Sequence, residues 1–433
     1  MKQDTKPEVC VVGLGYIGLP TAAIVARAGC RVRGVDVSHR VVETINRGEI
    51  HIEEADLDGL VQNVVARGLL TASTRVEPAD IFVIAVPTPF DKDHAPDLSF
   101  VLEAGRAVAP VLKPGDTVIL ESTSPVGTTE QLRDLMAEAR PDLRFPGLVS
   151  ETPDISIAYC PERVLPGRIL EELANNDRSI GGITPRCARR ALGFYKLFVK
   201  GACVTTDSRA AEMTKLVENA YRDVNIAFAN ELSIIADRMG LDVWEVIRLA
   251  NRHPRVNILS PGPGVGGHCI AVDPWFIVHG APGETPLIRT ARGVNDSKIH
   301  HVIARADALL AAHPEARVAC LGLAFKANID DFRESPARLV ASTLTRRYAD
   351  RISIVEPFIS ALPIEYRDTP VELIDIDTAL ERCEILIVLV DHDLFKSIPL
   401  TERAHKTVYD TRGIWPDQPK PTGALPLRLS AVG

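Results

Sequence analysis

The feature that most constrains the fold is a glycine-rich turn near the N-terminus, placed between a strand-like run and a helical run. Residues 9–12 are apolar and mostly β-branched, and Gly13, Gly15 and Gly18 follow with the spacing GxGxxG. An alanine-rich stretch comes next, and then a second strand-like run at residues 31–35. This order of strand, turn, helix and strand predicts the parallel β-α-β unit of a dinucleotide-binding domain, with the pyrophosphate at the helix N-terminus.

An acidic residue after the second strand-like run indicates which dinucleotide binds. Asp36 lies about twenty residues beyond the turn, where a carboxylate accepts hydrogen bonds from the adenosine ribose and repels a 2′-phosphate. NAD is therefore predicted rather than NADP. The residues of this segment assigned to the cofactor are Gly13, Gly15, Tyr16, Ile17, Gly18, Asp36 and Arg40.

Two further strand-like runs, residues 81–86 and 117–120, end in polar and proline-containing loops. Loops at the carboxyl ends of parallel strands line the ligand crevice of an open α/β sheet. Thr88 and Thr123 are therefore candidates to contact the cofactor. The alternative is that they only shape turns beside proline.

Composition restricts the class of protein. The chain has 433 residues, 46% of them hydrophobic, and a formal net charge of −8, which argues against a general nucleic-acid or membrane-surface binder. No apolar run is long enough to span a membrane. The eight cysteines are scattered without zinc-like spacing, so no metal site is predicted and a reduced, cytoplasmic setting is expected.

A long helix is predicted from Thr206 to Met239, with Asp207 or Ser208 as N-cap and Gly240 as the stop. At 1.5 Å per residue it is about 45 Å long, enough to bridge two domains or form a dimer seam. A polar stripe along it either faces solvent or lines an internal cleft. The residues of the stripe are Glu212, Lys215, Asn219 and Arg222.

A glycine-rich loop precedes one cysteine. Four glycines fall within residues 262–267, just before Cys269, so the backbone turns sharply or lies close to another group. Cys269 is either a nucleophile or an ordinary inert cysteine. Asp273 precedes a proline, which is also typical of a helix N-cap.

Three other segments carry candidate polar residues. Glu162 and Arg163 follow a strand-like run and form either a surface ion pair or part of a site. Residues 249–257 are a phosphate clamp or a loosely ordered basic loop. Ser335 and Pro336 are predicted as N-cap and first residue of a helix in a second α/β unit, which lacks a GxGxxG and receives no cofactor of its own.

These parts suit the oxidation of an alcohol beyond the aldehyde. An aldehyde has no second hydride to lose in a suitable geometry until a nucleophile adds to it, and the Cys269 thiolate would give a thiohemiacetal, then a thioester, then a carboxylate on hydrolysis. Lys215 and Asn219 could stabilise the oxyanion, and Asp273 or Glu162 could position the water.

Several ordered motifs resemble the UDP-glucose/GDP-mannose dehydrogenase family of nucleotide-sugar 6-dehydrogenases. They are the turn at residues 13–20, Lys215-x3-Asn219, the run Gly266-Gly267-His268-Cys269-x3-Asp273, Phe325-Lys326 and Arg333-Glu334-Ser335. The resemblance covers nearly the whole chain. Residues 161–167, 251–257 and 268–275 are most similar to the members that oxidise UDP-N-acetyl-D-mannosamine.

The resemblance implies two Rossmann-like doubly wound α/β domains joined by a central helical domain with one long helix. The expected domains are residues 1–205 for NAD, 206–300 for dimerisation and catalysis, and 301–433 for the UDP-sugar. The implied partners are the UDP-sugar and a second copy of the chain, through the long helix.

The resemblance also implies roles for individual residues. Cys269 would be the nucleophile, Lys215 and Asn219 would handle the oxyanion and protons, Asp273 would activate water, and Glu162 would lie near the reacting carbon. Arg333 would reach NAD, from its own subunit or from the other one. The residues implied at the UDP-sugar are Arg163, Val164, Lys215, Asn219, Arg222, His253, Arg255, Gly266 and Lys326.

Other functions remain open at this point. UDP-N-acetylglucosamine is an alternative substrate. A one-step hydroxyacid dehydrogenase of the 6-phosphogluconate type would share the glycine turn and Lys-x3-Asn, but has no use for Cys269. A non-catalytic NAD-binding sensor would leave the polar stripe and the cysteine loop without a role.

Overall fold

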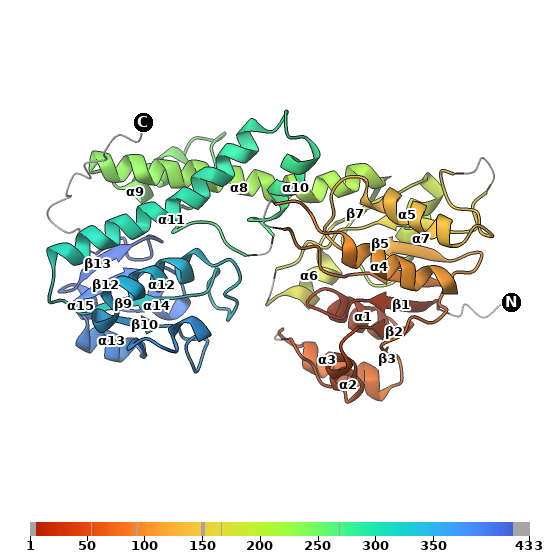
Figure 1. The fold of residues 1–433 in the computed structure, drawn as a ribbon, viewed down its shortest axis with the longest axis horizontal. Coiled ribbons are helices and arrows are strands. Elements are labelled where there is room, and N and C mark those ends of the chain that lie inside the picture. Colours follow the sequence, from red (N-terminus) through yellow and green to blue (C-terminus); the bar gives the residue numbers. More distant parts are fainter. Residues whose placement is uncertain are drawn as a thin grey trace. The chain divides into compact units, whose positions relative to one another are not determined.

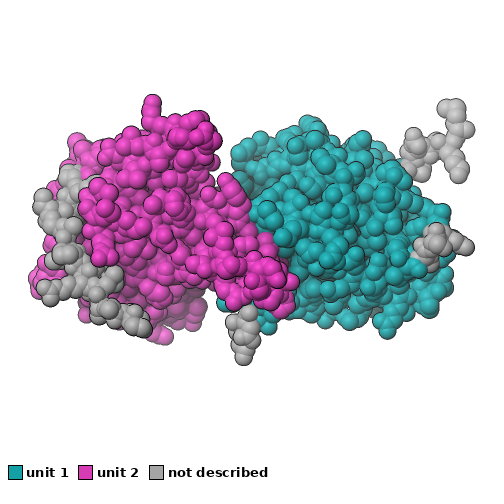
Figure 2. All heavy atoms as spheres, turned by 90° about the horizontal axis from the view of Figure 1, so that it is seen from above, with its two compact units in different colours: residues 1–218 teal, residues 219–433 magenta. Residues whose placement is uncertain are grey.

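The computed structural model describes residues 6–52, 54–91, 94–148, 152–165, 167–267 and 269–418. It divides into two compact units, Met1–Glu218 and Asn219–Gly433, which Figure 2 shows in teal and magenta. His268, within the motif that precedes Cys269, lies outside the described residues.

Unit 1 is built on an eight-stranded sheet in the order β3-β2-β1-β4-β5-β6-β7-β8 (Figure 1). Neighbouring strands are parallel except for the antiparallel pair β6 and β7. The order of the first six strands is that of the doubly wound dinucleotide-binding fold. The strands are β1 Glu8–Val12, β2 Arg31–Val35, β3 Leu70–Ser73, β4 Ile81–Ile84, β5 Thr117–Leu120, β6 Ser156–Tyr159, β7 Arg178–Gly182 and β8 Cys203–Asp207.

Helices cover both faces of this sheet because its central strands are apolar on both sides. In β1, Val9 and Val11 pack into one core with α1, α3 and α7, whereas Cys10 and Val12 pack into another with α4 and α5. Successive side chains of a strand point to opposite faces, so one short strand supports two cores. The helices are α1 Gly18–Arg27, α2 His39–Asn46, α3 Leu57–Ala66, α4 Ser99–Val108, α5 Thr128–Ala139, α6 Ile169–Asn175 and α7 Pro185–Tyr195.

Unit 2 contains a parallel five-stranded sheet in the order β11-β10-β9-β12-β13. In β9, Val318 and Cys320 face α11 (Pro286–Ala312) and α12 (Pro336–Tyr348), whereas Ala319 and Leu321 face α13 (Ile376–Arg382) and α14 (Asp393–Lys396). The predicted second α/β unit is therefore confirmed. Its strands are β9 Val318–Leu321, β10 Ile352–Val355, β11 Glu372–Leu373, β12 Ile385–Val388 and β13 Thr407–Asp410.

Helices other than α8 in unit 2 are α9 Val243–Ala250, α10 Asp273–Gly280, α11 Pro286–Ala312, α12 Pro336–Tyr348, α13 Ile376–Arg382, α14 Asp393–Lys396 and α15 Leu400–Arg403. At α12, the Ser335 hydroxyl accepts the Arg338 N–H at 3.2 Å and Pro336 opens the helix, as predicted. Short 3₁₀ turns lie at Ala109–Val111, Ala349–Arg351 and Ile364–Tyr366.

The predicted long helix is α8, Ser208–Met239, a continuous helix of 32 residues. The Asp207 carboxylate accepts the Ala210 N–H at 2.9 Å, which is the predicted N-cap. Gly240 follows the helix with φ +68°, a backbone conformation that favours glycine. The boundary between the two units falls inside this helix, and the division into domains at residues 205 and 300 remains a proposal.

Two of the strands missed by the sequence analysis, β7 and β8, have weak patterns. β7 contains two glycines and begins with arginine, and β8 is a largely exposed edge strand with three polar residues. Neither resembles an apolar or alternating run, so pairing with the rest of the sheet decides their conformation. Among the described residues, no helix is both long enough and apolar enough to cross a membrane.

Candidate active site

The glycine turn has the backbone geometry of a dinucleotide site. Gly13 has φ +91°, and its N–H donates to the Val35 carbonyl at 2.8 Å. A Cβ on Gly18 would lie 1.7 Å from the Gly13 carbonyl oxygen, so only glycine fits where the turn enters α1. Ile17 is the N-cap residue of α1, and among the described residues no side-chain hydrogen bond caps the helix there. The N–H groups of its first turn can therefore receive a phosphate.

Asp36 lies beside this turn. Its carboxylate accepts the Leu14 N–H at 3.1 Å and the Ser38 N–H at 2.9 Å, and it is half-buried at the end of β2. Tyr16 is 40% exposed, and Arg40 is exposed in the first turn of α2. The cofactor residues predicted in this segment thus lie after the carboxyl ends of the parallel strands β1 and β2, and they fit NAD.

The loops after β4 and β5 are joined to each other. Thr88 donates its hydroxyl to the Thr123 carbonyl at 2.6 Å, and Ser122 donates to the Val86 carbonyl at 2.7 Å. A Cβ on Gly13 would lie 2.5 Å from the carbonyl oxygen of residue 85, so the glycine turn contacts the first of these loops. Thr88 and Thr123 therefore lie near the predicted cofactor site, and Thr88 also shapes its turn.

Glu162 and Arg163 do not form the surface ion pair considered above. Glu162 is 7% exposed, and its Oε2 accepts from Nη1 of Arg178 at 2.6 Å. Its Oε1 accepts the backbone N–H of Arg163 at 2.7 Å, whereas the Arg163 guanidinium pairs with Glu218 at 2.6 Å. That interpretation is wrong because each side chain has another partner of opposite charge.

A buried polar network behind Glu162 was not predicted. Glu121 is fully buried, and burial raises its pKa to about 7. The Tyr195 hydroxyl donates to Glu121 at 2.7 Å, and the Arg178 guanidinium lies 5.4 Å from the centre of the Tyr195 ring. Glu121 directly follows β5, whereas Arg178 and Tyr195 belong to β7 and α7, and the three share no local motif. The one available signal is a glutamate directly after the apolar run Val118-Ile119-Leu120.

Val164 packs beside a small apolar cluster of Ile24, Ile169 and Leu173. It therefore has a structural role in unit 1, next to the loop that carries Glu162. The contact of Val164 with the UDP-sugar stays a prediction.

The polar stripe of α8 is mostly buried. Glu212, Lys215 and Asn219 are 0%, 7% and 6% exposed, so the solvated-face interpretation is wrong for these three. Arg222 is exposed and departs from the stripe. Glu212 has a separate role, because its carboxylate accepts N–H groups of the first turn of α5, from Gly127 at 2.6 Å and Thr129 at 2.8 Å.

Asn219, Asp273 and Cys269 meet within unit 2. The Asn219 amide donates to Asp273 Oδ2 at 2.5 Å, and both side chains are buried. The Cys269 carbonyl accepts the Asp273 N–H at 2.9 Å, which ties the cysteine to the start of α10. Cys269 is exposed, unlike an inert core cysteine. The N-cap of α10 is Val272 rather than Asp273, so the capping interpretation of Asp273 is wrong.

The glycines before Cys269 contact protein. A Cβ on Gly266 would lie 2.3 Å from the Glu334 carbonyl oxygen and 2.6 Å from Pro336, and one on Gly267 would lie 2.7 Å from the Phe325 ring. The Gly267 N–H also donates to the Arg333 carbonyl at 3.2 Å. Close packing on the loop before α12 therefore requires these glycines. The contact of Gly266 with the UDP-sugar stays a prediction.

A second unpredicted network supports the start of this loop. Asn230 on α8 accepts the Gly262 N–H at 2.9 Å, and its amide donates to Asn295 on α11 at 2.9 Å. Asn295 in turn donates to Asp223 at 2.8 Å, and Asp223 pairs with the buried Arg292 at 2.6 Å. The glycine loop is thus fixed to two helices at its beginning and to the α12 side at its end.

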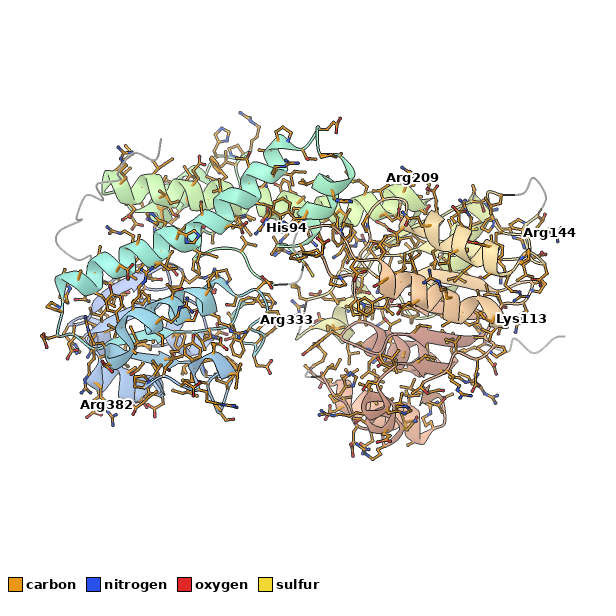
Figure 3. The ribbon with its side chains drawn as sticks, in the orientation of Figure 1. His94, Lys113, Arg144, Arg209, Arg333 and Arg382 are labelled. Atoms are coloured by element: carbon orange, nitrogen blue, oxygen red, sulfur yellow. The ribbon has the colours of Figure 1, made fainter. Side chains whose placement is uncertain are left out.

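The remaining predicted residues lie on three segments of unit 2. His253 and Arg255 are exposed in the turn after α9, where the Arg255 N–H donates to the His253 ring at 3.3 Å. Lys326 is half-buried after β9. Arg333, labelled in Figure 3, pairs with Asp331 on the loop before α12.

The doubly wound sheet, the glycine turn and Asp36 define an NAD-binding oxidoreductase. The chain belongs to the UDP-glucose/GDP-mannose dehydrogenase family, because three family models match it: the NAD binding domain at residues 7–199, the central domain at 209–297 and the UDP binding domain at 319–417. The resemblance found in the sequence is confirmed, as are the fold class and NAD as cofactor.

Individual relatives cover nearly the whole chain. A UDP-N-acetyl-D-mannosamine dehydrogenase of Yersinia pestis is 56% identical over 94% of this chain and 99% of its own. An NDP-N-acetyl-D-galactosaminuronic acid dehydrogenase of Ralstonia nicotianae is also 56% identical, over 94% of this chain and 96% of its own. The solved structure of a UDP-D-ManNAc dehydrogenase of Pyrococcus horikoshii matches with a TM-score of 0.83 and 37% identity, covering 94% and 96% of the two chains.

Proposed function

We propose that this protein oxidises the C6 alcohol of UDP-N-acetyl-D-mannosamine to the carboxylate of UDP-N-acetyl-D-mannosaminuronate. The observation that carries the proposal is the hydrogen bond of Asn219 to Asp273, whose backbone N–H in turn bonds the carbonyl of the exposed Cys269 at the start of α10. A nucleophile, an amide donor and a buried carboxylate are the groups needed to take an aldehyde on to an acid. A one-step hydroxyacid dehydrogenase needs no such cysteine.

The first half of the reaction removes a hydride and a proton from the alcohol. NAD, when bound, would supply the hydride acceptor for each of the two oxidations. Lys215, one helical turn before Asn219 on α8, is proposed to handle the alcohol proton and stabilise the oxyanion. Glu162 is proposed to lie near the reacting carbon.

The second half depends on the thiol. The Cys269 sulfur adds to the aldehyde carbon to form a thiohemiacetal, and loss of a second hydride and a proton gives a thioester. Water then attacks the thioester carbon, the carbon–sulfur bond breaks, and the acid and the thiol are released. Asp273, held by the Asn219 amide, is proposed to take a proton from this water.

The sugar is the finer part of the proposal. Relatives at equal identity carry names that refer to N-acetylmannosamine and to N-acetylgalactosaminuronic acid. Oxidation of a nucleotide-linked N-acetylhexosamine is therefore better supported than the choice among hexosamines. UDP-N-acetylgalactosamine is the second candidate, and UDP-N-acetylglucosamine is the alternative substrate that the sequence left open.

One assay tests both the substrate class and the choice of sugar. NADH formation is measured with UDP-linked N-acetylmannosamine, N-acetylgalactosamine, N-acetylglucosamine and glucose, and about two NADH per sugar are expected for the preferred substrate. Strong preference for glucose would refute the N-acetylhexosamine class. Cys269→Ala should stop acid formation while NAD still binds, and full acid formation by this variant would refute the covalent route.

We also propose a homodimer formed through α8. Apolar side chains are exposed along this helix, including Tyr221 at 62%, Phe228 at 52% and Met239 at 66%. A row of exposed apolar residues is typical of an interaction surface. Phe228→Asp should give a monomer in light scattering, whereas Phe100→Asp, which alters an exposed phenylalanine on α4, should not. A dimeric Phe228→Asp variant would contradict the assignment of this surface.

A further inference from the structure

Arg178 and Glu162 form a buried ion pair in unit 1. Arg178 is the first residue of β7, and the side chains of the two residues are 2% and 5% exposed. Nη1 of Arg178 donates to Glu162 Oε2 at 2.6 Å, and Nη2 donates to the Leu173 carbonyl at 3.2 Å. The other carboxylate oxygen accepts the Arg163 N–H at 2.7 Å. Donors on both oxygens fix the orientation of the Glu162 carboxylate.

Such a pair is a poor device for stability alone. Removing two charges from water costs several kcal/mol per ion, so apolar residues of similar volume often stabilise a core as well or better. The Arg178 Nε is buried without a hydrogen-bond partner among the described residues, which adds to the cost. A buried arginine with this cost, bonded to a carboxylate with a proposed role at the reacting carbon, points to function.

A second carboxyl group lies in the same electrostatic environment. Burial chiefly raises the pKa of Glu121 to about 7, the Glu162 charge adds to this effect, and the Arg178 charge opposes it. Tyr195 and Thr21 donate hydrogen bonds to Glu121, at 2.7 and 3.3 Å. The guanidinium, in contrast, bonds directly to Glu162. Among the described residues, Arg178 therefore hydrogen-bonds to Glu162 and acts on Glu121 through its charge.

We propose that Arg178 is a positioning residue for the oxidation: its buried guanidinium orients the Glu162 carboxylate and supplies its counter-charge. The inference rests on the proposed function, because it takes Glu162 as a catalytic residue. Arg178 acts only through Glu162 and needs no contact with substrate or cofactor.

A double-mutant cycle on the full-length enzyme tests this role. Arg178→Met should lower kcat about tenfold to a hundredfold and leave the KM for NAD within about twofold. In the Glu162→Gln background, the same change should lower kcat less than about twofold, because the charge that Arg178 serves is already gone. Arg178→Lys should restore part of kcat, since it keeps the charge without the planar fork.

Equal losses of kcat from Arg178→Met in the two backgrounds would overturn the proposal. Arg403 provides the matched control, because it is 4% exposed and pairs with Asp417 at 2.6 Å in unit 2. Arg403→Met should lower the melting temperature with kcat within about twofold of the wild type, and a loss as large as that of Arg178→Met would also overturn it.

Two safeguards keep the outcome clear. If Arg178→Met does not fold, the cycle is run with Arg178→Lys, and equal losses in both backgrounds again count against the proposal. Failure of the proposed function would appear separately, as a wild-type enzyme that forms no NADH with any UDP-N-acetylhexosamine.

Discussion

Gly266→Ala is the sharpest test of how the glycine loop supports the thiol. The new Cβ would lie 2.3 Å from the Glu334 carbonyl oxygen and 2.6 Å from Pro336, and side-chain carbons are essentially never found closer than 3.0 Å to such atoms. The Cβ and the carbonyl must therefore separate by about 0.7 Å. The carbonyl belongs to the backbone, so no side-chain rotation can relieve the contact.

Both stability and catalysis should respond. Overpacking of this kind costs about 1 to 3 kcal/mol. Cys269 is three residues further along, and a displacement of this size at a reacting atom lowers kcat by on the order of a hundredfold. NAD affinity should fall less than kcat, because the glycine turn and Asp36 belong to unit 1 and only Arg333, next to the displaced Glu334, is predicted to reach NAD.

The assay combines NADH formation, thermal unfolding and NAD binding by fluorescence. Gly283→Ala is the control, because a Cβ there would meet no atom within 4 Å. A Gly266→Ala enzyme with wild-type kcat and melting temperature would refute the claim that backbone packing requires this glycine.

Three further predictions concern buried polar groups. Between pH 4.5 and about 7 the unfolded chain releases the Glu121 proton and the folded chain keeps it, so the wild type loses stability as pH rises. Glu121→Gln lacks this loss, so its free energy of unfolding should gain on the order of 3 kcal/mol relative to wild type in denaturant titrations across this range. A difference that stays constant with pH would contradict the raised pKa of Glu121. Burial lowers the pKa of Lys298 from 10.5 to about 8. Between pH 8 and 10.5 the unfolded chain therefore binds more protons than the folded chain. In denaturant titrations, the free energy of unfolding of the wild type should rise with pH relative to that of Lys298→Met. Asn219→Ala leaves the buried Asp273 short of a donor and should cost about 1 to 3 kcal/mol, part of which Asn219→Ala/Asp273→Ala should recover. Additive losses in calorimetry would show that the two residues do not interact.

Sequence patterns predicted the parts of the fold that depend on local chemistry. The turn at Gly13 and Gly18 requires glycine for its own backbone, and Asp36 follows at a fixed distance along a β-α-β unit. The lysine and asparagine of α8 are spaced by one helical turn. Such signals are contained within a few dozen residues, so the sequence alone reveals them.

Contacts between distant segments could not be predicted. Arg178 and Glu121 lie 57 residues apart in the sequence, and their charges interact because β7 and the end of β5 belong to one sheet. Glu212 belonged to a polar stripe predicted to face solvent or line a cleft, but it caps α5, more than eighty residues earlier in the chain. Asp273 had the pattern of an N-cap, and the Asn219 side chain instead bonds its carboxylate.

The position of Asp36 limits how the cofactor preference of this enzyme can change. Its carboxylate accepts the Leu14 N–H from inside the glycine turn as well as the Ser38 N–H. A substitution that admits a 2′-phosphate would therefore also remove an acceptor that closes the phosphate-binding turn. Conversion to NADP would need a second change that supplies a new acceptor for Leu14, so a single substitution at residue 36 should weaken binding of both dinucleotides.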